Sequence, residues 1–85
     1  MILDNYVMAE LNGKFPTGTF DLISQGGDRV LYRNNKGQVL SEVSDKVYFT
    51  PTPNTTGLII PIPHGTPLPS QIAMSIRAFI IAHPK

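Results

Sequence analysis

The chain contains no cysteine, and this absence excludes disulfide bonds, thiol catalysis and zinc–thiolate sites together. Charge is also scarce, because Asp, Glu, Lys and Arg make up 15% of the residues, below the usual fraction of about 25%. Seven basic and six acidic residues leave a net charge of +1. So small a charge argues against a strongly basic nucleic-acid binder and against an acidic DNA mimic.

Long apolar segments are missing as well. No apolar run reaches the roughly 18 residues of a membrane span. The first residues do not show the charged region and apolar stretch of a secretory signal peptide. We therefore expect no membrane partner, no signal peptide, and a location in the cytoplasm or in a virion.

The 85 residues support one small domain, and their composition changes along it. All six carboxylates precede Lys46, whereas seven of the eight prolines lie from Pro51 onward. We interpret this change as two halves of a single β domain that covers residues 1–85. Its expected parts are a meander at 6–50, a Pro/Thr connector at 51–57 and an apolar, proline-punctuated half at 58–85.

The first half alternates apolar segments with turn signals spaced about 8–12 residues apart, which is typical of small sandwiches and barrels. Asn12-Gly13 is a strong hairpin signal, because a type I′ turn needs positive φ at both central residues. Gly26-Gly27, Asn34–Gly37 and Ser44-Asp45 mark further turns. The resulting predicted strands are 6–11, 19–23, 29–33, 38–43 and 46–49.

The proline doublet in Leu58–Pro63 predicts an edge strand. Residues two apart in a strand direct their N–H groups to the same neighbour, and Pro61 and Pro63 have no N–H to give. The segment can therefore pair fully on its other side alone, which protects it against the addition of a further strand.

Residues 72–82 decide the fold class. As a strand, this segment has one wholly apolar face, and its isoleucine and phenylalanine residues favour strands. As a helix, it places Ser75 and Arg77 about 160° apart, so that they share no polar face. On the other side, Pro69-Ser70 is typical of a helix start, and the alanines favour a helix. We predict a strand.

The sequence thus predicts an all-β fold. Its expected form is a small antiparallel meander that closes into a sandwich or barrel of about six or seven strands. The alternative is a β-meander capped by a C-terminal helix.

Residues that could carry chemistry are few and scattered. His64 and His83 have no carboxylate near them in the sequence and match no compact metal-ligand spacing. Glu10, Asp21 and Glu42 are spaced like the polar residues of alternating strands, which indicates solvated positions and not an acid–base pair. We therefore predict no enzymatic activity, no catalytic residue, no cofactor and no metal site.

Nucleic-acid binding by a small β-barrel is the strongest chemical alternative. Arg29 and Arg33 share one face of a predicted strand, and Lys36 lies in the adjoining turn. Tyr32, however, lies on the opposite face of that strand. Binding of a single strand combines basic groups with stacking aromatics on one surface, so we rank nucleic acid below protein as a partner.

The second half of the chain offers apolar surface for protein contact. One small sheet does not easily cover an element that is apolar on both faces. These residues therefore form either the core of a sandwich or an interface with another chain. The candidate interface residues are Leu58, Ile60, Ile62, Leu68, Ile72, Met74, Ile76, Phe79 and Ile81.

These patterns favour a non-enzymatic structural or adaptor module that acts through protein–protein contact, as a homo-oligomer or within a larger assembly. In its size, its lack of cysteine and its Thr/Asn/Pro-punctuated β pattern, the chain resembles small accessory components of virions, such as the capsid decoration and tail proteins of phages. Two alternatives stay open. They are a nucleic-acid-binding β-barrel that uses Arg29, Arg33 and Lys36, and a small inhibitor directed at a host protein.

Overall fold

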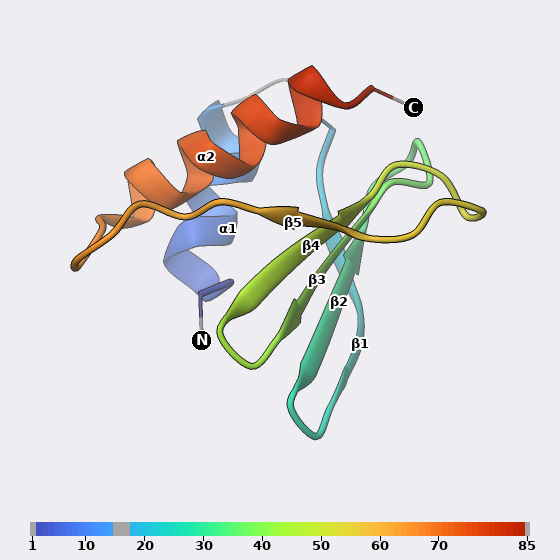
Figure 1. Ribbon diagram of the computed structural model, residues 1–85, viewed down its shortest axis with the longest axis horizontal. Coiled ribbons are helices and arrows are strands. Elements are labelled where there is room, and N and C mark those ends of the chain that lie inside the picture. The colour runs from blue at the N-terminus through green and yellow to red at the C-terminus, as the bar shows by residue number, and fades with distance from the viewer. Residues whose placement is uncertain (1, 15–17, 85) are drawn as a thin grey trace.

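The structure is a computed structural model that describes residues 2–14 and 18–84. In this part of the chain, two helices flank a run of five strands (Figure 1). In chain order these elements are α1 (Asn5–Lys14), β1 (Asp21–Gly26), β2 (Arg29–Arg33), β3 (Val39–Val43), β4 (Lys46–Thr50), β5 (Leu58–Ile60) and α2 (Pro69–Ala82).

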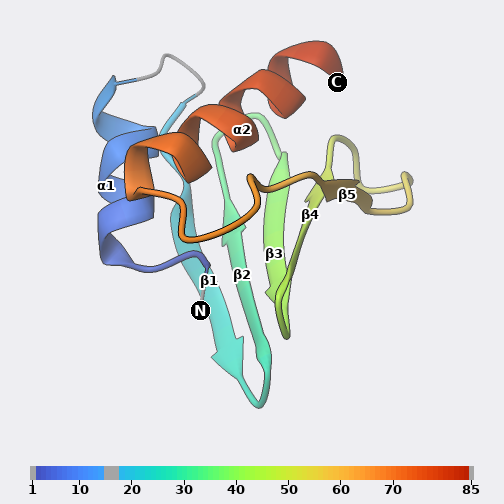
Figure 2. The same cartoon turned by 60° about the vertical axis from the view of Figure 1, so that its left-hand side comes forward.

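The five strands form one antiparallel sheet in the order β1-β2-β3-β4-β5. The strands predicted between residues 19 and 49 are confirmed, although their bounds shift by a few residues. The sheet does not close into the predicted sandwich or barrel. Instead, α1 and α2 pack against each other and lie on one side of it, as the turned view shows (Figure 2). The fold is therefore an open β-meander with helices on one face.

The strand predicted at 6–11 and the hairpin predicted at Asn12-Gly13 are wrong, because this segment is α1. The Asp4 side chain caps the helix by accepting a hydrogen bond of 2.9 Å from the Val7 N–H. Val7 and Leu11 lie four residues apart and are fully buried, together with Met8. Spacing of this kind gives a helix an apolar stripe, and burial of that stripe overrides the local turn signal.

Asn12 has a role in α1 that its turn propensity did not predict. Its side-chain carbonyl accepts a hydrogen bond of 3.1 Å from the Phe20 N–H, and its amide nitrogen donates one of 3.3 Å to the Phe20 carbonyl. The side chain thus pairs with the backbone of the residue directly before β1, as a neighbouring strand would. This pairing ties α1 to the start of the sheet.

The strand predicted at 72–82 is also wrong, and the alternative of a meander with a C-terminal helix is the correct one. Pro69 occupies the first turn of α2, where a missing N–H costs little. The Gln71 side chain accepts a hydrogen bond of 2.8 Å from the Leu68 N–H. Ile72, Ile76 and Ile80 recur every four residues and are buried along with Ala73, so one face of α2 suffices to bury the isoleucines that favoured a strand.

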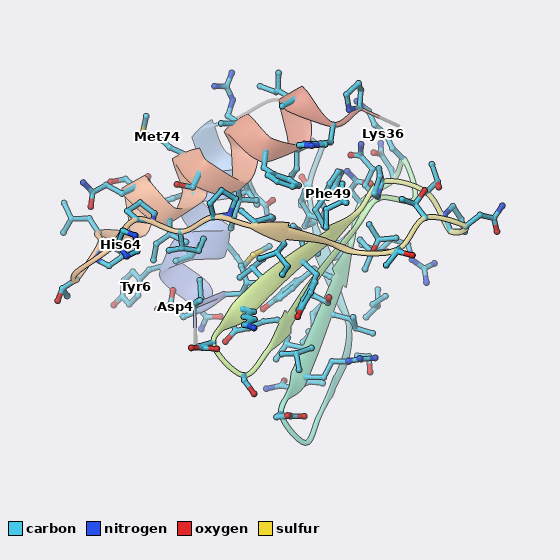
Figure 3. The ribbon with its side chains drawn as sticks, in the orientation of Figure 1. Asp4, Tyr6, Lys36, Phe49, His64 and Met74 are labelled. Atoms are coloured by element: carbon cyan, nitrogen blue, oxygen red, sulfur yellow. The ribbon has the colours of Figure 1, made fainter. Side chains whose placement is uncertain are left out.

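Aromatic contacts join α2 to the sheet. The rings of Phe49 on β4 and Phe79 on α2 meet edge to face, with centroids 6.2 Å apart. Figure 3 shows Phe49 between the sheet and α2. The His83 ring stacks on Phe79 at a centroid distance of 4.1 Å and closes the C-terminal end of the helix.

β5 is an edge strand, as its prolines predict, but it is shorter than the predicted segment. It pairs with β4 through Leu58, Ile59 and Ile60, and the pairing stops before Pro61. The chain then runs without regular structure to α2.

Glu42 is buried, which contradicts its predicted solvated position. The residue is 1% exposed and lies on the helix-covered side of β3. One oxygen of its carboxylate accepts a hydrogen bond of 2.6 Å from the Leu3 N–H and the other accepts one of 2.9 Å from the Ile2 N–H. Both donors directly precede the capping Asp4, so Glu42 fixes the segment that leads into α1.

We expect Glu42→Ala to lower the free energy of unfolding on the order of 3 kcal/mol, because two backbone donors lose their acceptor at about 1–3 kcal/mol for each buried one. Asp45→Ala, in the exposed turn after β3, is the matched control and should change stability little. Denaturant unfolding of both variants measures the difference. Equal stability of the two variants would contradict the role given to Glu42.

Tyr32 lies close to this buried carboxylate. Burial raises the pKa of Tyr32 above its ordinary value of 10.0, and the charges of Glu42 and Asp4 raise it further. Because the pKa is higher in the folded state, Tyr32 contributes stability below about pH 10, and this contribution is lost as the pH rises through the folded-state value.

Tyr32→Phe should therefore lose less stability than the unmodified chain as the pH rises above about 10. Tyr6→Phe, at an exposed position on α1, should follow the unmodified chain. Unfolding in denaturant over a series of alkaline buffers gives the three slopes. The prediction fails if the Tyr32 variant has the same slope as the other two proteins.

Candidate binding surface

The sheet has two faces of different character. The strand register places the side chains of β2, β3 and β4 alternately toward the helices, on the inner face, and away from them, on the outer face. From β2 to β5, the outer face carries Arg29, Leu31, Arg33, Val39, Ser41, Val43, Lys46, Tyr48, Thr50 and Ile59, and residues of β1 continue its rows.

β3 departs in part from the usual polarity of a sheet with one solvated face, although Leu40 is buried on the inner face as expected. Such a sheet normally turns apolar residues inward and charged residues outward. Here Glu42 is on the inner face, whereas Val39 and Val43 are on the outer face, on either side of Ser41. The outer face is therefore more apolar than contact with water requires.

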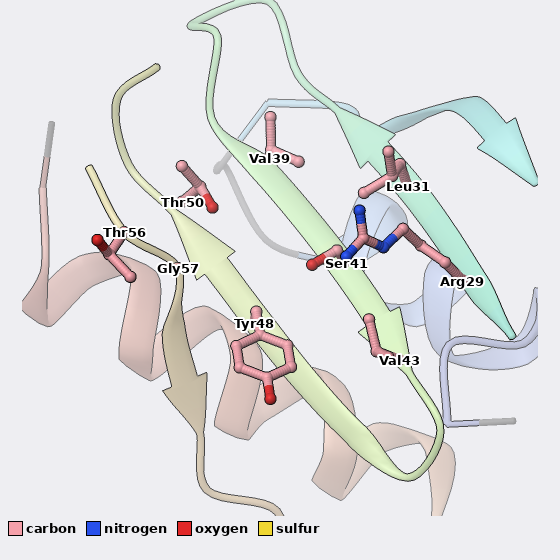
Figure 4. Close-up of a pocket in the computed structure, with 9 residues that line it drawn as sticks. All are labelled: Arg29, Leu31, Val39, Ser41, Val43, Tyr48, Thr50, Thr56 and Gly57. Atoms are coloured by element: carbon pink, nitrogen blue, oxygen red, sulfur yellow. The ribbon is translucent and has the colours of Figure 1, made fainter. Parts of the chain in front are cut away.

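A shallow depression of about 420 Å³ lies on the outer face. Figure 4 shows the Tyr48 ring over β4, the Leu31 and Val39 side chains farther along the sheet, and the Arg29 side chain extended toward Ser41. Val43, Thr50, Thr56 and Gly57 also line this depression.

Gly57 permits a close approach at the rim of the depression. A Cβ atom added there would lie 3.3 Å from the Tyr48 Cβ and 3.4 Å from the Thr50 hydroxyl oxygen. A side chain at this position would be tight against the Tyr48 Cβ and in ordinary contact with Thr50, so glycine fits the close approach of this segment to β4.

The positive charges of the outer face lie at its two ends. Arg29 and Lys46 occupy one cross-strand row with Val43, and Arg33 occupies another with Val39. The prediction that Arg29 and Arg33 share a face is confirmed, and Tyr32 lies on the inner face as expected.

Lys36 is exposed in the turn after β2. Sequence reasoning missed Tyr48, which adds an aromatic ring to the same face as the arginines.

The candidate interface residues at 58–82 do not form one surface. Ile60, Ile72 and Ile76 belong to the core of a single chain. Leu58, Ile62 and Phe79 are half-buried. The exposed members are Leu68, Met74 and Ile81, of which the first lies before α2 and the other two lie on it.

The two histidines are placed apart. His64 is exposed and lines a second depression with Ser44, Asp45 and Ile62. His83 caps α2. Within residues 2–14 and 18–84, no group of three or more His, Asp or Glu side chains comes together that could hold a metal ion.

Comparisons with known proteins give no relative for this chain. Neither the family models, nor the curated proteins, nor the solved structures yield a match. Neither helix of the described part of the chain is long and apolar enough to cross a membrane.

The sequence did contain a signal for the outer face, but its phase was ambiguous. In Val39–Val43, apolar residues occur at both odd and even positions, so alternation alone does not tell which set is buried. The pairing of β3 with β2 and β4 decides which residues face inward. Leu40 lies opposite Tyr32 and Phe49 on the inner face, so Val39, Ser41 and Val43 face outward.

Proposed function

We propose that this protein is a non-enzymatic structural or adaptor module that binds another protein through the outer face of its sheet. The observation that carries the proposal is that β3 places the Glu42 carboxylate inside and two valines outside. Valine favours strands in any setting, so the supporting feature is the combination of a buried carboxylate with valines that are only half-buried on the opposite face.

The composition of the outer face supports a protein partner. Its centre is apolar and hydroxylic, with Leu31, Ser41 and Tyr48 in one cross-strand row and Ile59 at its end. Interface cores lack charge and are enriched in tyrosine and arginine, while their rims are polar. Arg29 and Arg33, at the two ends of β2, fit such a rim.

A role as an accessory component of a virion, such as a capsid decoration or tail protein, is part of this proposal. It is supported by the size of the chain and by the absence of cysteine.

Capture of the tagged full chain from the cells or virions that naturally contain it tests the proposal. The unmodified protein should bring down a protein partner in constant ratio, and Tyr48→Ala should weaken binding of the purified partner about tenfold or more, as loss of a buried interface tyrosine does. Met74→Ala, at an exposed position of α2, is the matched control and should bind normally. Loss of binding in the Met74 variant alone would place the interface on the helices and overturn the proposal.

A second candidate function is binding of single-stranded nucleic acid on the same outer face. The observation that favours it is that Arg29, Arg33 and Lys46 share this face with Tyr48, since basic groups and a stacking ring are the elements of such sites. Lys36, in the neighbouring turn, would lie at the rim of the bound strand.

This second function predicts binding of a mixed-sequence single-stranded oligonucleotide that weakens as salt is raised. Arg33→Ala should reduce the affinity and also the slope of the salt dependence, because one phosphate contact is lost. Arg77→Ala, on α2 and away from the outer face, is the control for a general loss of charge. Fluorescence anisotropy measures both quantities, and absence of binding at low salt would eliminate this candidate.

A further inference from the structure

The two edges of the sheet are unequal. β5 has three residues, and Pro61 and Pro63 follow it directly. β1 has six residues without proline, all of them exposed, including Leu22 and Ile23 at 53% and 44%. An exposed strand edge is a template for pairing with another strand. The β1–β2 hairpin also extends beyond the helices in both ribbon views, which leaves this edge accessible (Figures 1 and 2).

A β-bulge gives β1 an unusual order of faces. The register shifts between Leu22 and Ser24, so that Ile23 is the additional residue. Asp21 and Ser24 lie opposite Arg33 and Leu31 of the outer face. Ile23 lines a small depression with Asp21 and Arg33, which places it on the outer face too. From Asp21 to Gly26, the residues of β1 therefore face outward, inward, outward, outward, inward and outward. This order is the same when it is read from either end of the strand.

This palindromic order permits β1 to pair with itself. Residues directly opposite each other in an antiparallel pair point to the same face of the sheet. A regular strand of six residues cannot meet this condition about its own centre, because its first and last residues point to opposite faces. We propose that two copies of this chain associate through antiparallel pairing of β1 with β1, with Asp21 opposite Gly26, Leu22 opposite Gln25 and Ile23 opposite Ser24 of the second copy.

The backbone groups of β1 suit this register. Gly27 has φ of 60°, which fits the first central position of a type II′ hairpin turn. The flanking residues, Gly26 and Arg29, then exchange backbone hydrogen bonds. On this pattern Gln25 and Leu22 direct their N–H and C=O groups to the open edge. These are the two residues that the proposed register sets opposite each other, so each such pair exchanges both hydrogen bonds.

The charges of the hairpin favour a second copy of the chain over an unrelated strand. In the proposed register, Asp21 lies opposite Gly26 of the second copy, and Arg29 of that copy is next in the same outer-face row. In the single chain Arg29 extends toward Ser41; Gly26 has no side chain to separate Arg29 from Asp21 of the other copy, so the arginine can reach the carboxylate once it turns toward the junction. Two-fold symmetry produces this contact twice and sets no like charges opposite each other.

The dimer goes beyond the proposed function, because it would join two outer faces into one continuous surface. Its test is independent of any partner. Light scattering with size exclusion should give twice the chain mass of 9.3 kDa as concentration rises through the micromolar range. Gln25→Pro removes an N–H that points to the open edge and should give the monomer mass, whereas Gln25→Ala should remain dimeric.

Cross-linking tests the register without relying on the proline variant. The chain has no cysteine of its own, so Leu22→Cys mixed with Gln25→Cys should form a disulfide-linked dimer on mild oxidation, since opposed positions lie within disulfide reach. Leu22→Cys alone should cross-link far more slowly, because the two copies of this position lie at opposite ends of the pairing. Ile59→Cys, at the other edge, is a second control. A monomer mass at all concentrations would overturn the proposed dimer. Equal cross-linking of all these cysteine variants would overturn it too.

Discussion

Burial of one face of the sheet is the constraint on which the rest of the structure depends. Two helices of 10 and 14 residues supply the apolar side chains that cover the inner face. Among the described residues, both helices lie on this inner side of the sheet and neither covers the other face (Figure 2). The outer face therefore stays open, and its apolar residues remain available for contact with another molecule.

The Glu42 carboxylate belongs to this same constraint. It occupies the inner face, where it binds the backbone N–H groups of Ile2 and Leu3 and so positions the start of α1. It shares the inner side of β3 with Leu40, which fixes the phase of the strand, and in this phase Val39 and Val43 point outward. The phase that buries Leu40 and Glu42 thus also determines which residues form the opposite surface.

The sequence predicts the middle of this fold well and its two ends poorly. The turns at Gly27-Asp28, Asn34–Gly37 and Ser44-Asp45 are set by local chemistry, since each requires a tight reversal at polar or glycine residues. The segments that become α1 and α2 carry β-branched and aromatic residues or a turn dipeptide, and their helical state depends on mutual packing. Local propensity is a weak guide to such segments. The outer face was only half predictable for a related reason: Arg29 and Arg33 follow from simple alternation, whereas Tyr48 required the pairing of β4 with β3.

Chemical labelling of the three tyrosines tests whether the outer face of the sheet forms the contact with a partner, because each tyrosine lies on a different surface. Tyr6 is exposed on α1, Tyr32 lies on the inner face and Tyr48 lies on the outer face. Tyrosine footprinting of the protein, free and in its natural assembly, compares them within one chain. If the outer face forms the contact, assembly should protect Tyr48 from labelling and leave Tyr6 fully reactive. Protection of Tyr6 with unchanged reactivity of Tyr48 would show that the helices form the contact, and would contradict the proposal.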